Sequence, residues 1–232
     1  MKNYYLTSTV TFVYEQNGLQ VTGACLWVAI GGNPTFINCR FTSKYKPEVN
    51  AIAGVGFEAN ATFENCIFDG NDFRSSVLVL HHKGRGTVKN CTIKNSSGGE
   101  ALFISSGAIA EFEDSVFESN KTGLICSGDG EVTMKNCSFN NNGCGIAVMG
   151  EGLANVSDCH FIGHSDASIF MKEQARGTFE NNEIIDGKQF GVLIRSEEPI
   201  VFRSNVLKNN TMNWLIQCSG KQLQRIDNEP NE

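Results

Sequence analysis

Two short runs in the sequence contain residue types that could do acid–base chemistry. The run HHK (81–83), with Arg85 close behind it, offers imidazole and ammonium groups that could act as a general base or bind phosphate. Glu197 and Glu198 are the nearest approach to the paired carboxylates with which glycosidases work. A His pair at the end of a strand is also typical of a solvated corner, so the interpretation depends on the elements that position these residues.

The third candidate is a phrase that recurs along the chain. TFENCIF (62–68), TVKNCTI (87–93) and TMKNCSF (133–139) each contain Thr, an apolar residue, a charge, Asn, Cys, a variable residue and a large apolar residue. Cysteine thiols can act as nucleophiles or bind zinc, but the sequence has no Cys-x-x-Cys pair. The phrase is either an active site or a joint of the architecture.

The spacing of this phrase indicates a structural repeat. Its Cys position, called the anchor below, recurs every 22 to 27 residues. Short apolar runs such as LVL (78–80) and IFM (169–171) precede the anchors, and no stretch sustains helical periodicity. We therefore predict an all-β solenoid, a parallel β-helix of about eight to nine coils with three short strands per coil. The anchors are Cys39, Cys66, Cys91, Ser115, Cys137, Cys159, Asn182 and Asn205.

Residues at equal offsets from the anchor should form columns along such a solenoid. The position before the anchor is mostly Asn or Asp, which tolerate the left-handed conformation of a sharp turn. Two positions before it, the charges of Glu64, Lys89 and Glu113 alternate in sign, which predicts an exposed ion ladder. The anchors then point inward, and we interpret the Asn-Cys phrase as an architectural joint.

Composition limits the function classes. The chain has 232 residues, enough for one domain, and a net charge of −6, which argues against a nucleic-acid-binding groove. No stretch approaches 18 apolar residues, and the N-terminal MKNYYLTSTV lacks the apolar run of a signal peptide. Nine Cys, five of them in one interior column, suit a reducing compartment. Asn-x-Ser/Thr triplets such as those at Asn60, Asn95 and Asn120 count towards secretion, but Asn-rich turns generate them by chance. We predict a cytoplasmic location.

Two coils of the chain resemble a known repeat. GTFENNEIIDGKQFGVLI (177–194) and GVLIRSEEPIVFRSNVLKN (191–209) are similar to the right-handed parallel β-helix repeat. That repeat occurs in pectate-lyase-like enzymes, in F-box-only substrate adaptors and in SHC-SH2-domain-binding (Nessun-dorma-like) proteins. The Cys-bearing anchors are most similar to the intracellular adaptors. The resemblance implies a single-domain right-handed parallel β-helix over residues 24–218, and a fragment of a larger intracellular adaptor.

The flanking residues are expected to differ from the coils. Residues 1–23 are interpreted as an incomplete first coil at the N-terminal edge. Residues 219–232 are polar, contain a Pro near the end, and are expected to form a frayed tail.

The outer face of the first strand in each coil is the predicted functional site. If Leu78 and Leu80 point inward, Val79 points outward and belongs to a column of apolar residues, and exposed apolar patches usually mark contacts. We predict a non-catalytic scaffold, without cofactor or metal, that binds another protein, an upstream segment of the same protein or a second copy. The predicted contact residues are Trp27, Val79, Phe103, Ile125, Phe170 and Leu193, with Arg195, Lys172 and His81 beside them.

Three other interpretations of this column stay open. A missing segment of the chain could cover it, or sugars could stack on Trp27, Phe103 and Phe170. A register error of one residue would exchange inside and outside. The alternative function is a carbohydrate-binding or polysaccharide-cleaving β-helix. In those enzymes, clusters of Asp and Glu on the outer face hold calcium or act as acids, and no such column is evident here.

Overall fold

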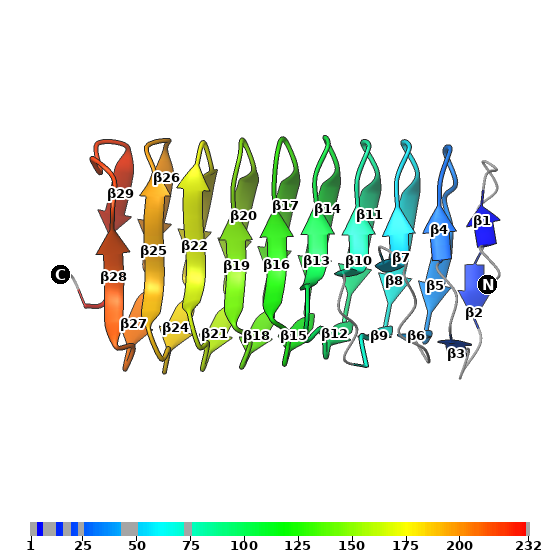
Figure 1. The fold of residues 1–232 in the computed structure, drawn as a ribbon, viewed down its shortest axis with the longest axis horizontal. Coiled ribbons are helices and arrows are strands. Elements are labelled where there is room, and N and C mark those ends of the chain that lie inside the picture. The colour runs from blue at the N-terminus through cyan, green and yellow to red at the C-terminus, as the bar shows by residue number, and fades with distance from the viewer. Residues whose placement is uncertain are drawn as a thin grey trace.

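The structure is a computed structural model that describes residues 4–6, 13–15, 20–22, 26–42, 51–71 and 76–230. Within these ranges the chain forms strands and turns and no helix, so the all-β prediction is confirmed. The strands stack side by side as the rungs of a solenoid (Figure 1). No described segment is a helix with the length and apolarity to span a lipid bilayer.

The strands form three parallel sheets, named A, B and C, to which each coil contributes one strand. Sheet A contains β1 (Tyr4–Leu6), β4 (Leu26–Val28), β7 (Ala51–Val55), β10 (Ser76–Leu80), β13 (Glu100–Ile104), β16 (Thr122–Cys126), β19 (Cys144–Val148), β22 (Ala167–Glu173), β25 (Phe190–Ser196) and β28 (Met212–Ile216). Sheet B contains β2 (Val13–Glu15), β5 (Thr35–Ile37), β8 (Asn60–Glu64), β11 (Arg85–Lys89), β14 (Ile109–Glu113), β17 (Glu131–Lys135), β20 (Leu153–Ser157), β23 (Arg176–Glu180), β26 (Ile200–Arg203) and β29 (Leu223–Ile226). Sheet C contains β3 (Gln20–Thr22), β6 (Arg40–Thr42), β9 (Ile67–Asp69), β12 (Thr92–Lys94), β15 (Val116–Glu118), β18 (Ser138–Asn140), β21 (His160–Ile162), β24 (Glu183–Ile185) and β27 (Val206–Lys208).

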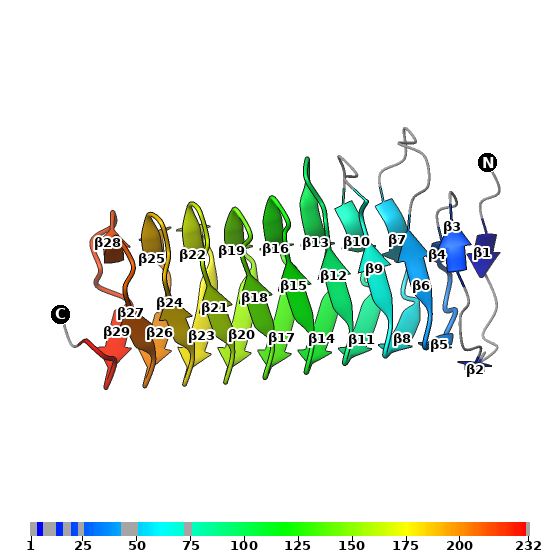
Figure 2. The same ribbon diagram turned by 90° about the horizontal axis from the view of Figure 1, so that it is seen from below.

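Each strand pairs with its copies in the coils before and after it, as the two perpendicular views show (Figures 1 and 2). The register reproduces the columns predicted from the anchor. Val88 pairs with Phe63 and Phe112, and Lys89 pairs with Glu64 and Glu113. The predicted ion ladder is present at two steps, because Lys89 Nζ lies 3.1 Å from Glu113 and Arg203 lies 2.6 Å from Glu180.

The core is a set of stacked inward columns. On sheet C, Phe117, Phe139 and Phe161 are fully buried, with successive ring centroids 4.6 and 4.7 Å apart and nearly parallel planes. This spacing matches the separation of paired strands, so each ring lies directly over the ring of the previous coil. Each such ring contributes roughly 1.5–3 kcal/mol through the apolar surface it buries.

The turn from sheet B to sheet C explains the Asn of the repeated phrase. Asn65, Asn90 and Asn136 have φ of 53°, 50° and 51°, the left-handed region that Asn tolerates. Their amides also bridge coils, since Asn90 Nδ2 donates to Asn65 Oδ1 at 2.6 Å and Asn136 Nδ2 donates to Asp114 Oδ1 at 2.6 Å. Asn therefore turns the chain and ties neighbouring coils together.

The Cys of the phrase is an acceptor in a second, buried ladder. The Cys66 backbone N–H donates to Cys91 Sγ at 3.3 Å, and the Cys159 N–H donates to Asn182 Oδ1 at 2.9 Å. Because these backbone groups are buried, each needs an acceptor from the next coil. Cys, Ser and Asn all provide one, and these are the residue types found at the anchors. The phrase is thus a joint of the winding, as interpreted from its spacing.

The C-terminal residues extend this ladder, where a frayed tail was expected. Strand β29 lies within 219–232 and pairs with β26. Asn228 is buried, and its Oδ1 accepts from the Asn205 N–H at 3.0 Å while its Nδ2 donates to the Phe202 carbonyl at 3.0 Å. A polar segment is ordered here because its one buried amide satisfies the backbone of the preceding coil.

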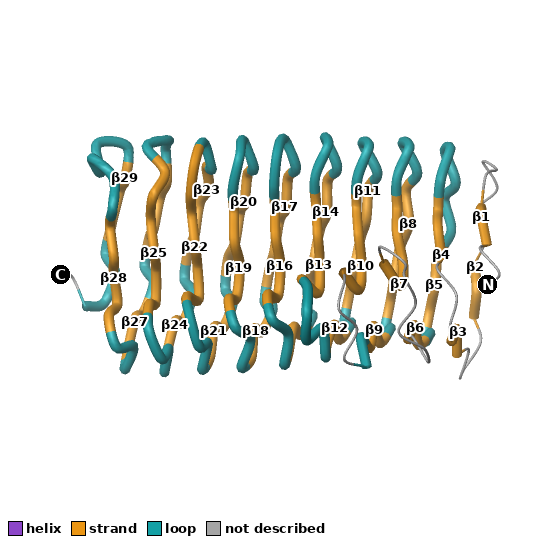
Figure 3. The backbone as a smooth tube through the Cα atoms, viewed as in Figure 1, coloured by secondary structure: helices purple, strands orange, loops and turns teal. Residues whose placement is uncertain are grey.

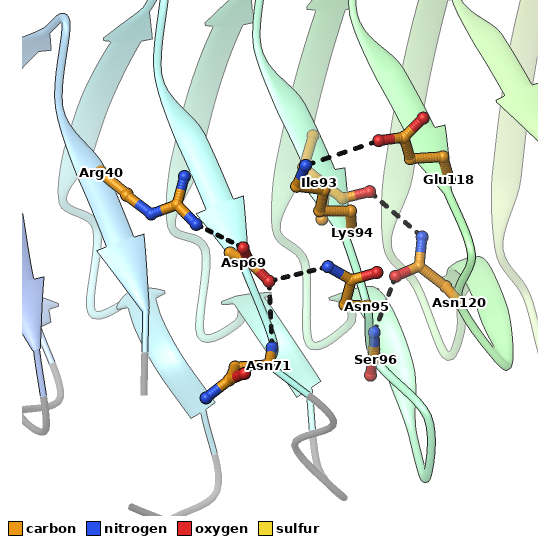
Figure 4. A network of polar contacts seen from close by, with 9 residues as sticks. All are labelled: Arg40, Asp69, Asn71, Ile93, Lys94, Asn95, Ser96, Glu118 and Asn120. Carbon is orange, nitrogen blue, oxygen red and sulfur yellow. Dashed lines mark hydrogen bonds and ion pairs between the residues drawn. The ribbon is translucent and has the colours of Figure 1, made fainter. Parts of the chain in front are cut away.

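The turn from sheet C back to sheet A carries a third ladder (Figure 4). Asn120 Oδ1 accepts from the Ser96 N–H at 3.0 Å, and its Nδ2 donates to the Ile93 carbonyl at 3.1 Å. Nearby, the Asp69 carboxylate accepts from Arg40 at 2.5 Å and from Asn95 Nδ2 at 2.9 Å. These bonds fix the corner at which sheet A begins.

Candidate functional site

The outer face of sheet A carries the predicted column in the predicted register. Val79 pairs with Gly54 and Phe103, and Phe170 pairs with Ala147 and Leu193. The pairing continues without a break through every member of the column. In order, these are Trp27, Gly54, Val79, Phe103, Ile125, Ala147, Phe170, Leu193 and Leu215.

The side chains of this column are unequally exposed. Val79, Phe103, Ile125 and Phe170 are half-buried, since stacked neighbours in the column shield one another. Leu193, one of the predicted contact residues, is 6 % exposed and so offers little surface. The Trp27 side chain lies outside the described residues. The accessible part of the column is therefore a narrow apolar row on β10, β13 and β16, separated from Phe170 on β22 by Ala147, which is 4 % exposed.

The flanking residues predicted with the column lie together in the next outward position. His81, Lys172 and Arg195 each follow their column residue by two, as Met149 also does, so they form a second row on the same face. The Arg195 guanidinium lies over the Phe170 ring, 5.5 Å from its centroid, and Arg195 Nε donates to Gln217 Oε1 at 2.7 Å. The two rows are thus in contact.

The turn from sheet A to sheet B, called the A–B corner, adds a hollow to this face. These turns form the upper edge in Figure 3. A hollow of about 530 Å³ opens there next to the row that contains His81. It is lined by Ile30, Phe57, Glu58, His82, Lys83, Ser106 and Asp129.

Two residues of the HHK run, His82 and Lys83, line the hollow. The His82 ring stacks on Phe57 with centroids 4.8 Å apart, and the His81 ring meets Phe57 edge-on at 5.6 Å. Burial, and then the charge of the neighbouring His82, hold the pKa of His81 below its usual range. His82 therefore adds an aromatic ring to the wall of the hollow, while His81 packs against Phe57 beside it.

The acidic candidate, Glu197 with Glu198, does not form a pair of catalytic carboxylates. Both oxygens of Glu197 face Ser219, whose backbone N–H donates to Oε1 at 2.7 Å and whose hydroxyl contacts Oε2. Those hydrogen bonds lower the pKa of Glu197. Within the described ranges, no three His, Cys, Asp or Glu side chains gather as metal ligands would.

The winding and the family comparison agree. Residues 75–228 match the family described as the right handed beta helix region, which is about two-thirds of the chain. The chain belongs to the right-handed β-helix family. The handedness inferred from the resemblance is thereby supported. No curated protein matches the chain significantly.

Sequence reasoning located the outer row of this β-helix but missed the hollow. The row follows from the two-residue period of a strand, which the sequence shows directly. The hollow depends on large side chains at turn positions of positive φ, where Gly or Asn is usual. The feature of the sequence that indicates the hollow is a large apolar residue in a turn, namely Ile30 in IGG (30–32) and Phe57 in GFEA (56–59).

Proposed function

We propose that this β-helix is a non-catalytic protein-interaction scaffold that binds a partner protein through the outer face of sheet A. The observation that carries the proposal is the apolar row of Val79, Phe103, Ile125 and Phe170, whose side chains are half-buried, with the buried Ala147 between the last two. When a partner covers apolar surface that was in contact with water, the free energy of the system falls, which favours binding.

The contrast with sheet B supports this choice of face. The outward positions of sheet B hold polar or charged residues in most coils, such as Thr87, Lys89, Glu113 and Thr133. Such a surface is well solvated without a partner. The row on sheet A consists of aliphatic and phenyl side chains, which neither take up nor release protons, so it is suited to recognition by packing.

The flanking row would give the contact its specificity. Lys172 is paired with Glu173 at 3.0 Å, and Arg195 is held over Phe170. The residues that dominate binding at protein interfaces are enriched in aromatic and Arg side chains, and a positioned cation beside apolar surface is an arrangement of this kind. The proposal also agrees with the resemblance of the Cys-bearing coils to intracellular adaptor proteins.

A double substitution tests the proposed face. Phe103→Asp with Phe170→Asp places two charges in the row, and we expect loss of partner capture from native extract because a charge at an apolar contact must be desolvated. The matched control is Asn155→Asp with Val201→Asp on the outer face of sheet B, which should leave capture intact. Circular dichroism and Tm would show that both variants fold. Unchanged capture by the first variant, or turnover of a polysaccharide in a lyase assay with calcium, would contradict the proposal.

We propose a cytoplasmic location on two grounds. Burial raises the pKa of the Cys39 thiol to about 11 and that of Cys126 to about 12, so these free thiols stay protonated inside the core. Asn120, the Asn of a glycosylation triplet, is 4 % exposed, and both of its amide atoms are engaged in the ladder. A glycan on Asn120 would break those bonds.

A further inference from the structure

We propose that the hollow at the A–B corner binds an extended segment of a partner protein that carries a large apolar residue and, four residues away, a Lys or Arg. The inference rests on the proposed function in that the occupant is a protein. It names a second contact, beside the apolar row, and the chemistry of the segment that fits it.

Strain at the corner is the first argument. Ile30 and Phe57 have φ of 52° and 54°, a region that β-branched and bulky residues rarely adopt. Later coils place Gly128 and Gly150 at the same turn position, with φ of 60° and 62°, where no strain arises. Gly at this position is therefore compatible with the winding. The large residues in the early coils lower the stability of the fold, and the fold does not require them.

Exposure is the second argument. Ile30 is 64 % exposed and Phe57 is 50 % exposed, and both line the same hollow. At the same turn position the side chains become smaller along the axis, from His82 to Ser106 and then to Gly128, and the first two line the hollow. Strained, exposed apolar side chains beside a recess are suited to receive one large apolar side chain of a partner.

The charges of the corner define the rest of the segment. The third residue of successive turns is Glu58, Lys83, Gly107, Asp129 and Glu151, and all four charged members are exposed. Within the described residues, neither the Glu58 carboxylate nor the Lys83 ammonium forms an ion pair. Asp129 Oδ1 accepts from the Gly107 N–H at 2.7 Å. Beyond Lys83 the row is acidic, so a cation of the partner belongs at Asp129 and Glu151.

The geometry sets the spacing of the two residues. Phe57 and Asp129 lie three coils apart, and coils stack at about 4.8 Å, which gives about 14 Å. An extended chain rises about 3.3 Å per residue, so four residues span about 13 Å. Side chains four positions apart in a strand also lie on the same face. One segment lying along the axis can therefore fill the hollow and reach the carboxylates.

Labelled ten-residue peptides test the inference by fluorescence anisotropy on the full chain. The probes carry Leu and Arg four positions apart, in either order, within a neutral background. We expect at least one order to bind tenfold or more tightly than a peptide with a spacing of two, and than one in which Glu replaces Arg. Equal binding of all peptides, or binding of none, would overturn the inference.

Phe57→Gly separates a binding role from a structural one. We expect this variant to lose peptide affinity tenfold or more while its Tm holds or rises, because Gly adopts φ of 54° without strain. Asp129→Asn should remove the preference for Arg over a neutral residue. A variant Phe57→Gly with lowered Tm and unchanged affinity would assign Phe57 to the fold alone.

The two proposals fail separately. Phe103→Asp with Phe170→Asp should leave affinity for the corner peptide unchanged, since neither residue lines the hollow. If these substitutions abolish partner capture but no peptide binds, the corner inference is lost and the scaffold proposal stands. If a peptide binds with the predicted spacing but capture is unaffected by the double substitution, the apolar row is not the contact face.

Discussion

At the scale of single residues, the inward ladders require an acceptor more than a particular amino acid. The Cys91 N–H donates to Ser115 Oγ at 3.1 Å, and the Asn182 N–H donates to Asn205 Oδ1 at 3.0 Å. Thiol, hydroxyl and amide thus fill equivalent places, because each accepts one buried backbone N–H. The identity of each anchor is free within that limit, which is why the repeat is regular in structure and variable in sequence.

His164 is the residue at which a ladder is least well satisfied. Its Nδ1 lies 3.2 Å from the Asn142 N–H, which donates to it, but its Nε2 is buried without a hydrogen-bond partner among the described residues. The Ser168 hydroxyl is also buried and has no hydrogen-bond partner in the part of the chain that the structure describes. Burial lowers the pKa of His164 to about 4. A proton on this ring would therefore be poorly tolerated in the folded state.

Acid should consequently destabilise the fold through His164. The folded ring binds a proton only near pH 4, whereas the unfolded ring does so near its ordinary pKa of about 6.5, so acid favours the unfolded state. The free energy of unfolding attributable to His164 should fall by about 2 kcal/mol between pH 7 and pH 5. Urea unfolding at both pH values measures it.

The control for the acid prediction is His164→Asn. Asn142 occupies the same turn position one coil earlier and donates through Nδ2 to the Phe117 carbonyl at 2.9 Å, so Asn suits this ladder. The variant should lose most of the difference between pH 7 and pH 5. A variant with the same pH dependence as the wild type would show that other groups, such as His81, cause it.

At the scale of elements, the three corners of each coil differ in the residues that form them. The B–C corner uses Asn and Asp both to turn the chain and to tie the coils. At the C–A corner these tasks are separate, since Ser119 and Asn141 have positive φ and the residues after them, Asn120 and Asn142, tie the coils. Asn142 Oδ1 accepts from both the N–H and the Nδ2 of Asn120, at 2.9 and 3.0 Å. The A–B corner differs, since its early turns hold large side chains at positive φ. The residue types at two corners are thus restricted by the need to turn the chain and tie the coils, whereas those at the A–B corner are free to vary.

The proposed cytoplasmic location makes a prediction about the native protein. Peptide mapping by mass spectrometry should find every Asn-x-Ser/Thr triplet unmodified and the cysteines reduced. Asn60 and Asn155 are exposed and offer accessible triplets, so they are the matched controls for buried Asn120. A glycan at Asn60 or Asn155, or a native disulfide, would place the chain in the secretory route.

At the scale of the whole molecule, the winding was predictable and the surface only in part. The anchor spacing predicted the columns because each coil repeats the strand pairing of the coil before it. The offset of a residue from its anchor, as for Val88 or Lys89, therefore determines where that residue lies in the solenoid. Exposure along the row was not predictable, since shielding by stacked neighbours buries Leu193 and leaves Phe170 half-exposed. The hollow and the ordered residues around Asn228 depend on turn conformation and on single hydrogen bonds, which periodicity does not encode.

Site-specific photo-cross-linking in native cells tests the central claim, that the outer face of sheet A is a protein contact. A photoreactive phenylalanine analogue would replace Phe103 or Phe170 on that face, and Thr133 or Asn155 on the outer face of sheet B. We predict one discrete protein adduct from positions 103 and 170, and none from 133 and 155. Adducts of equal yield from both faces, or none from sheet A, would contradict the account.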